Sequence, residues 1–432
     1  MHNLTPDGKK ALRKAARGEI DDCFLSSATS VRRRKWLHKS NRYVQDCSKQ
    51  YDEDLKTSPP SVDHRALAHY VAASGPTHII DGWSFLGRAI DATLRADSTS
   101  AVHLAYYAEL RAAMALLASE GIGVFNRHHP IVLRGGRTCV CPQKLGTHKF
   151  VWPCLQHWAG LSRARELLDT IVRPASFSLS NWMSRLNGKV ASSVLAEKWF
   201  RTWGMDIGLF DEDHDLRNVV SYRPSEFNPH DDSDASTILS FVNDLWRCLE
   251  PCGGGRFPNF EQGVLRRSLK ATKAQPIDEA ALVNIFGFER GTASAWANIL
   301  TSSAELSIFK AAESVATTAR AGSHLSVIAR SALLLLVATA SAHHQMQKAG
   351  YKSLDLEFWW RRHAVARGLR LPATVSSSTD SWADLKACLD DMMSWVADHS
   401  GTADLGAWRR EQSHVVESLG AMENVAIWGL VA

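Results

Sequence analysis

The feature that most constrains the fold is the recurrence of apolar residues at helical spacing along most of the chain. Residues 102–120, VHLAYYAELRAAMALLASE, repeat apolar side chains at helical spacing, are rich in alanine and stop at Gly121. This pattern predicts a helix with a natural C-terminal end. The same period predicts helices over residues 159–172, 191–203, 235–249, 304–319, 323–348, 381–399 and 411–429. We therefore expect an all-α, mostly helical protein.

Strand signals are confined to short apolar runs. Ile131-Val132-Leu133 and Phe150-Val151-Trp152 predict the two strands of a small hairpin around Gly135-Gly136. No alternating set of strands and no repeat of fixed period accompanies them. The all-α expectation is unchanged by this hairpin.

Breaks in composition divide the 432 residues into three predicted parts. A basic N-terminal arm covers residues 1–60 and ends in Thr57-Ser58-Pro59-Pro60. A helical domain follows over residues 61–234 and closes in the polar loop 228–234. A second helical domain covers residues 235–432.

The positive charge is concentrated in the N-terminal arm. Residues 1–60 contain 13 Lys or Arg against 8 Asp or Glu, which is the whole net charge of +5, and the charge is densest at Arg32-Arg33-Arg34-Lys35. Such a patch attracts phosphate without sequence specificity, so it is a candidate nucleic-acid contact. The alternative is an ordinary solvated face.

A second mixture of aromatic and cationic residues lies in the C-terminal part. Trp360, Arg361 and Arg362 belong to the run FWWRRH, and such interleaving suits a groove that binds single-stranded nucleic acid. Alternatively, these arginines form the solvent-exposed face of an amphipathic helix whose tryptophans are buried. Both readings stay open.

Several patterns bear on compartment and cofactors. Residues 1–20 are polar and basic, unlike a signal peptide, and the longest apolar run, 331–342, is too short to span a bilayer. Eight cysteines in a chain of this length are not a disulfide scaffold, so we expect a cytoplasmic protein with reduced thiols and no membrane partner. Gly253-Gly254-Gly255 lacks the Lys-Ser/Thr of a phosphate loop, and no cofactor is expected.

One cluster offers soft metal ligands. Cys139, Cys141, His148, Cys154 and His157 fall within 19 residues, which is enough for a zinc ion. The Cys-x-Cys spacing is not that of a zinc knuckle, and the last two residues lie in an apolar helical stretch. We predict no metal, and zinc binding is the open alternative.

The sequence LRNVVSYRP at residues 216–224 carries the main candidate chemistry and follows the acidic run 211–215. Many metal-independent ribonucleases place a histidine, as general base, about five residues after the arginine of such an Arg-Asn pair. Here that position holds Tyr222. An unperturbed tyrosine has a pKa of about 10 and is a poor base at neutral pH.

With the paired tyrosines Tyr106-Tyr107, whose helix ends in Ser119-Glu120-Gly121-Ile122-Gly123, residues 80–235 resemble the HEPN superfamily. These helical bundles occur in prokaryotic toxins, antitoxin partners and phage-defence proteins. The resemblance implies RNA cleavage at the interface of a homodimer. It further implies that Arg217 binds phosphate and Asn218 orients it, while Tyr222 replaces the family's histidine.

The residues themselves leave other interpretations open. Arg217 could pair with Asp213 or Asp215 while Asn218 caps a helix, which would be a purely structural arrangement. A carboxylate of the run 211–215 could instead serve a glycosylase that excises a modified base from phage DNA.

Two further alternatives concern a second site and a protein without catalysis. Arg127 and His129, beside His128, follow a helix end and are further catalytic candidates because they offer a cation and titrating imidazoles. A non-catalytic scaffold that binds nucleic acid or a partner protein is the remaining hypothesis.

Overall fold

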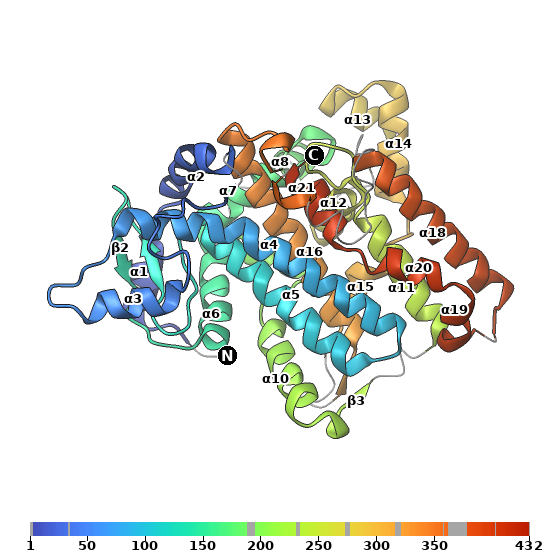
Figure 1. Cartoon of the computed structure of the whole chain (residues 1–432). Coiled ribbons are helices and arrows are strands. Elements are labelled where there is room, and N and C mark those ends of the chain that lie inside the picture. The colour runs from blue at the N-terminus through green and yellow to red at the C-terminus, as the bar shows by residue number, and fades with distance from the viewer. Residues whose placement is uncertain are drawn as a thin grey trace.

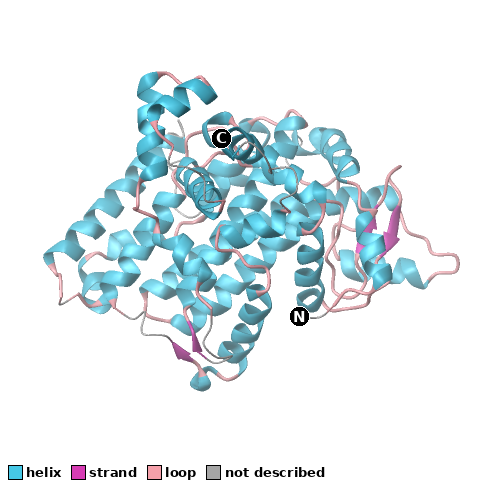
Figure 2. Ribbon diagram, turned by 180° about the vertical axis from the view of Figure 1, so that it is seen from behind, coloured by secondary structure: helices cyan, strands magenta, loops and turns pink. Residues whose placement is uncertain are grey.

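A computed structural model of the chain confirms the all-α prediction, since the protein is about 72% helical. The structure describes residues 3–32, 35–187, 195–229, 234–272, 277–315, 321–356, 358–361, 378–401 and 403–431. Helices lie on all sides of the molecule, and the short strands occupy its margins (Figure 1, Figure 2).

Three long helices form the centre of the molecule (Figure 1). They are α4 (His64–Leu94), α5 (Ser98–Ser119) and α16 (His324–Lys348). The side chains of Asp63 and Asp97 accept hydrogen bonds from main-chain N–H groups in the first turns of α4 and α5, as N-caps do. The predictions for residues 102–120 and 323–348 are therefore confirmed.

Glycines allow α4 to approach its neighbours closely. A Cβ atom on Gly82 would collide with the Leu335 side chain of α16, and one on Gly87 would collide with the main-chain oxygen of Gly420. Between them, Trp83 is fully buried and donates from Nε1 to Thr339 Oγ1 at 3.0 Å. The middle of α4 is thus fixed against α16 by both packing and a hydrogen bond.

Helix α16 has the length and composition of a membrane-spanning helix. Of that apolar stretch, 94% is buried inside the protein, which is how the core helix of a folded domain also looks. It packs against α4, α5, α15 and α21.

Packing crosses both of the domain boundaries that composition suggests. In the N-terminal segment, α1 (Pro6–Arg13), α2 (Arg17–Arg32) and α3 (Cys47–Lys56) contribute buried side chains to the same hydrophobic core as the rest of the chain. Asp21 of α2 pairs with Lys348 of α16 at 2.7 Å. The described residues of the segment 1–60 therefore pack against the rest of the chain.

The predicted hairpin is half right. Strand β1 (Pro130–Val132) pairs antiparallel with β2 (Thr138–Val140), and Gly135 and Gly136 turn the chain with positive φ. The run Phe150-Val151-Trp152 was the wrong partner, because it lies in α6 (Thr147–Ala159), where all three side chains are buried. A second pair, β3 (Asn228–Pro229) and β4 (Ala321–Gly322), is parallel.

The remaining helices surround the central three. They are α7 (Ser162–Ile171), α8 (Leu179–Asn187), α9 (Ala196–Thr202), α10 (Leu209–Tyr222), α11 (Ala235–Cys248), α12 (Pro258–Ala271), α13 (Glu279–Phe286), α14 (Arg290–Thr301), α15 (Ser307–Glu313), α18 (Ser378–Asp398), α19 (Leu405–Glu411), α20 (Ser413–Leu419) and α21 (Glu423–Val431), with 3-10 turns at Pro174–Ser176, Pro224–Glu226 and Ser353–Leu356. The single helix predicted over 411–429 was wrong, because the chain turns at Gly420 and forms α20 and α21.

Candidate functional site

The inner face of α10 brings Arg217 against the paired tyrosines of α5. The guanidinium carbon of Arg217 lies 5.1 Å from the ring centroid of Tyr106 and 5.6 Å from that of Tyr107, within cation–π range. Arg217 is buried, with 6% of its surface exposed. The two segments singled out in the sequence therefore do meet in space.

Three histidines from three helices surround this contact. The Tyr106 hydroxyl lies 2.9 Å from Nδ1 of His148 on α6, whose ring stacks 5.5 Å from that of His214 on α10. His103 of α5 places Nδ1 2.7 Å from the Ser221 hydroxyl. All three imidazoles are partly exposed, so the cluster lies at the surface. We call His103, Tyr106, Tyr107, His148, His214 and Arg217 the histidine–arginine cluster.

The spacing along α10 explains which residues join the cluster. His214, Arg217 and Ser221 are three and four residues apart and so share one face of the helix. Tyr222 is five residues after Arg217, lies on another face and is 76% exposed. The residue at the position expected for the general base is thus directed away from the arginine that it would serve.

Burial and the charge of Arg217 set the protonation of the cluster. Burial, followed by the nearby guanidinium, lowers the pKa of His103 and His214 and lowers that of His148 to about 4. These imidazoles are therefore neutral at pH 7. Burial raises the pKa of Tyr106 above its ordinary value, so its hydroxyl stays protonated. The hydroxyl oxygen can accept from His148 Nδ1–H, the tautomer that leaves Nε2 of His148 as the free acceptor.

Arg217 has no carboxylate partner within ion-pair distance in the described part of the chain, and its buried Nε has no hydrogen-bond partner there. The predicted pairing with Asp213 is wrong. Asp213 instead accepts two hydrogen bonds from Arg330 of α16, at 2.7 and 2.6 Å. Asn218 lies within α10 and caps neither end. The buried guanidinium of Arg330 satisfies Asp213, which leaves Arg217 among aromatic rings and imidazoles.

The Arg330–Asp213 pair belongs to a buried triad. Glu109 of α5 is fully buried, with Oε1 3.9 Å from Arg330 Nε. Burial and the charge of Asp213 raise the pKa of Glu109, which favours the protonated form of this carboxyl group. The triad joins α5, α10 and α16.

The acidic run before Arg217 is helical rather than a loop. Asp211 and Glu212 occupy the first turn of α10, where negative charge is favourable. Asp215 is exposed and lies 3.6 Å from Nδ1 of His214. Asp215 is therefore a carboxylate of this run that approaches a cluster imidazole.

His129 is a structural residue, so its predicted catalytic role is corrected. Its ring is fully buried and stacks on Phe150 at 3.6 Å, Nδ1 accepts from the Phe125 N–H, and Nε2 lies 2.8 Å from the Leu145 carbonyl oxygen. Both ring nitrogens are occupied by main-chain groups. Arg127 is exposed, and no contact joins it to the cluster in the described part of the chain.

The two predicted nucleic-acid contacts lie beside each other. Trp36, just after the basic run, packs its ring 5.5 Å from Phe358, and Arg32 lies 3.6 Å from Asp355. Trp360 is only 7% exposed, so the structure corrects its predicted role as a stacking surface.

The cations of these two contacts are only partly described. Arg32, Lys35 and Arg361 are exposed. Arg33, Arg34 and Arg362 lie outside the described residues.

The candidate zinc ligands do not form a metal site. No group of three or more His, Cys, Asp or Glu side chains in the described ranges is placed to hold a metal ion. Cys141 and Cys154 are buried in the core, and His148 belongs to the histidine–arginine cluster.

Outward from the cluster, an aromatic strip continues across α5 and α4. The Tyr107 ring lies 5.1 Å from His103 on one side and stacks 5.4 Å from Phe85 on the other. The exposed Arg88 lies 6.0 Å over the Phe85 ring. We call His103, Tyr107, Phe85 and Arg88 the aromatic strip.

Comparisons with protein-family models, with curated proteins and with solved structures each find no match. The HEPN resemblance therefore stays a prediction. The chemistry of the site has to be argued from its geometry.

Proposed function

We propose that the histidine–arginine cluster cleaves RNA without a metal ion. The observation that carries this proposal is the set of three neutral imidazoles around Arg217, which has no carboxylate partner in the described part of the chain. A phosphodiester would supply the missing negative charge. Paired imidazoles beside it are the usual groups for moving protons at neutral pH.

The reaction needs one base and one acid. A neutral imidazole removes the proton of the ribose 2′-hydroxyl, the 2′ oxygen attacks phosphorus, and a protonated imidazole gives its proton to the departing 5′ oxygen. The products are a 2′,3′-cyclic phosphate and a 5′-hydroxyl end. We assign His148 as the base and His214 as the acid, because Asp215 lies 3.6 Å from His214 Nδ1 and favours its protonated form.

Bound phosphate would also change the protonation of the site. The positive field of Arg217 lowers the pKa of both imidazoles, and an anion beside Arg217 opposes that field. Substrate binding therefore raises the pKa values of His148 and His214 towards neutrality, which makes an acid available only when substrate is present.

In this proposal, the role of the histidine that is missing at position 222 is taken by histidines that are distant in sequence but lie near Arg217 in the folded protein. His148 comes from α6 and His103 from α5, and both reach Arg217 by folding. The aromatic strip supports a single-stranded substrate, because the partly exposed rings of Tyr107 and Phe85 give unpaired bases an aromatic surface to contact.

The test is cleavage of a labelled single-stranded RNA in the presence of a metal chelator, with DNA of the same sequence as comparison. We expect the RNA to be cut with 2′,3′-cyclic phosphate ends and the DNA to remain intact. Removing a general acid or base lowers rates by about 10²–10⁴-fold. His148→Gln, His214→Gln and Arg217→Ala should all fall in this range.

His414→Gln is the matched control, because His414 is an exposed imidazole on α20. It should cleave at the wild-type rate, and melting curves should show that all variants are folded. Full activity of folded Arg217→Ala would overturn the proposal. DNA breaks that appear only after alkali would indicate base excision instead, and salt-sensitive binding without any product would indicate a scaffold.

A further inference from the structure

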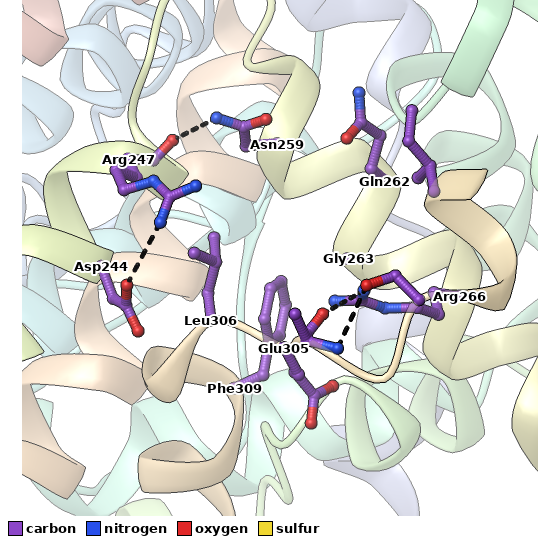
Figure 3. A pocket seen from close by; sticks show the side chains of 12 residues that line it. Asp244, Arg247, Asn259, Gln262, Gly263, Arg266, Glu305, Leu306 and Phe309 are labelled. Carbon is purple, nitrogen blue, oxygen red and sulfur yellow. Dashed lines mark hydrogen bonds and ion pairs between the residues drawn. The ribbon is translucent and has the colours of Figure 1, made fainter. Parts of the chain in front are cut away.

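A second candidate binding site lies far along the chain from the cluster, between α11, α12 and the segment that joins α14 to α15 (Figure 3). It is a hollow of about 230 Å³. Arg247 and Arg266 lie on opposite sides of it, with Phe309 between them and amide side chains along the rim (Figure 3). Nothing in the proposed cleavage reaction uses these residues.

The carboxylates of this hollow already have partners. Asp244 accepts a hydrogen bond from the Ser307 N–H at 2.8 Å, at the start of α15. Glu305 forms a two-point ion pair with Arg267, at 2.6 and 3.2 Å. The charge of Glu305 is therefore compensated within the protein, and one oxygen of Asp244 is occupied by a main-chain donor.

The two cations that face the hollow are not neutralised in the same way. Arg247 reaches Asp244 only at 4.0 Å, the outer limit of an ion pair. Arg266 donates from Nη1 to the main-chain carbonyl oxygen of Ala304, which carries no net charge. Two guanidinium groups with unused donors thus face one hollow, which is the arrangement that binds phosphate and carboxylate groups.

The rest of the lining suits an organic molecule rather than a bare ion. Ile299, Leu306 and Phe309 line the hollow, and a Cβ atom on Gly263 would occupy the position of the Phe309 ring. Gly263 therefore allows the Phe309 ring to pack directly against α12. Gln262 adds an amide donor and acceptor.

A larger hollow of about 520 Å³ adjoins the first and shares Arg266, Ser302 and Glu305 with it. It adds the exposed Lys270, the hydroxyl of Thr301 and the apolar Leu300. Its volume lies in the range of small-molecule sites, about 300–1,000 Å³. Together the hollows have room for a phosphate group and an attached organic body.

We propose that these adjoining hollows bind a phosphorylated small molecule of mononucleotide size, with its phosphate held by Arg247 and Arg266. The site is independent of the histidine–arginine cluster. The phosphate accepts hydrogen bonds from the two guanidinium groups, and the organic part of the ligand covers the apolar wall.

The test is calorimetric titration of the full chain with adenosine monophosphate, adenosine and inorganic phosphate. We expect the monophosphate to bind at least tenfold more tightly than adenosine, and phosphate to compete with it. Hydrogen bonds to charged groups contribute about 1.5–3 kcal/mol, so Arg247→Gln and Arg266→Gln should each weaken binding by about tenfold or more. Arg266→Lys should retain part of the affinity, since it keeps the charge.

Arg95→Gln is the matched control, because Arg95 is exposed and forms an ordinary surface pair with Asp91. It should bind as the wild-type protein does. Equal affinity for adenosine and its monophosphate, saturation absent at millimolar ligand, or wild-type binding by folded Arg247→Gln and Arg266→Gln would each overturn the proposal. Loss of binding in Arg217→Ala would show that the nucleotide occupies the cluster instead.

Discussion

At the scale of single residues, Arg217 of α10 and Arg330 of α16 show how differently one kind of side chain can be used. Arg330 donates hydrogen bonds to the carboxylate of Asp213 and to the main-chain oxygens of Ala312 and Ser314. Arg217 has aromatic faces and imidazoles but no described carboxylate. A buried charge with incomplete partners costs free energy, so the first arrangement stabilises the fold and the second favours an added anion.

The triad makes a prediction about two carboxylates that sequence alone would treat alike. Asp213→Asn leaves the buried guanidinium of Arg330 without its counter-charge, and breaking such a pair costs about 3–5 kcal/mol. Glu109→Gln should cost less than about 1 kcal/mol, because the raised pKa of Glu109 favours its protonated form, which the amide resembles. Urea unfolding at pH 7 measures both.

The pH dependence separates the two effects further. A raised pKa means that folding keeps Glu109 protonated where the unfolded chain would ionise, so its contribution to stability falls as pH rises above about 4.5. Glu109→Gln should therefore gain stability relative to wild type from pH 5 to pH 8. Equal losses for the two substitutions at pH 7 would contradict the assigned protonation.

At the scale of elements, the helices whose apolar residues recur without interruption could be predicted. A helix interrupted by proline or glycine could not. The pattern found α5, α11 and α16. Helix α4 was not predicted, because its period is interrupted by Pro76 and by glycines that are used for close packing. Local pattern cannot tell such a glycine from a helix end.

Likewise, only part of the candidate site could be predicted from the sequence. The contact of Arg217 with Tyr106 could be anticipated from two motifs, but the histidines could not, since they come from separate helices. His214 carried a signal, because it precedes Arg217 by three residues and so shares its face. His103 and His148 join it only through the packing of α5 and α6 against α10.

The glycines of α4 give a prediction at this scale. Gly87→Ala should destabilise by at least about 2 kcal/mol, the range typical of overpacking, because the new methyl group meets main-chain atoms that cannot rotate away. Gly82→Ala should cost less, because it meets the end of the Leu335 side chain. Thermal and urea unfolding of both variants would measure the difference.

Gly18 of α2 is the matched control for these substitutions, because a Cβ atom there meets no other atom within 4 Å. Alanine has the higher helix propensity, so Gly18→Ala should stabilise by up to about 1 kcal/mol. A Gly87→Ala protein as stable as wild type would contradict the close approach of α4 to Gly420.

At the scale of the whole molecule, buried neutral histidines make the fold sensitive to acid. Burial lowers the pKa of His78 to about 3 and of His129 and His148 to about 4. In the unfolded chain these imidazoles take up protons below about pH 6.5. Between pH 6.5 and 4 the unfolded state therefore binds more protons, and stability falls as pH falls.

We expect the free energy of unfolding to decrease from pH 7 to pH 4.5, with His129 alone contributing on the order of 2 kcal/mol. His129→Gln should lose part of this dependence, because glutamine can supply a donor and an acceptor without titrating. His414→Gln should keep the full wild-type dependence. Identical pH profiles for wild type and His129→Gln would contradict a buried neutral imidazole.

The packing of α16 against α4 and α5 also determines when a nascent chain can fold. Helices α4 and α5 are complete at Ser119, but α16 begins only at His324, about 200 residues later. At about 5–20 residues per second, a ribosome takes roughly ten to forty seconds to make that interval. Throughout it, the apolar faces that α16 will cover remain open on the growing chain, where chaperones or other nascent chains can reach them.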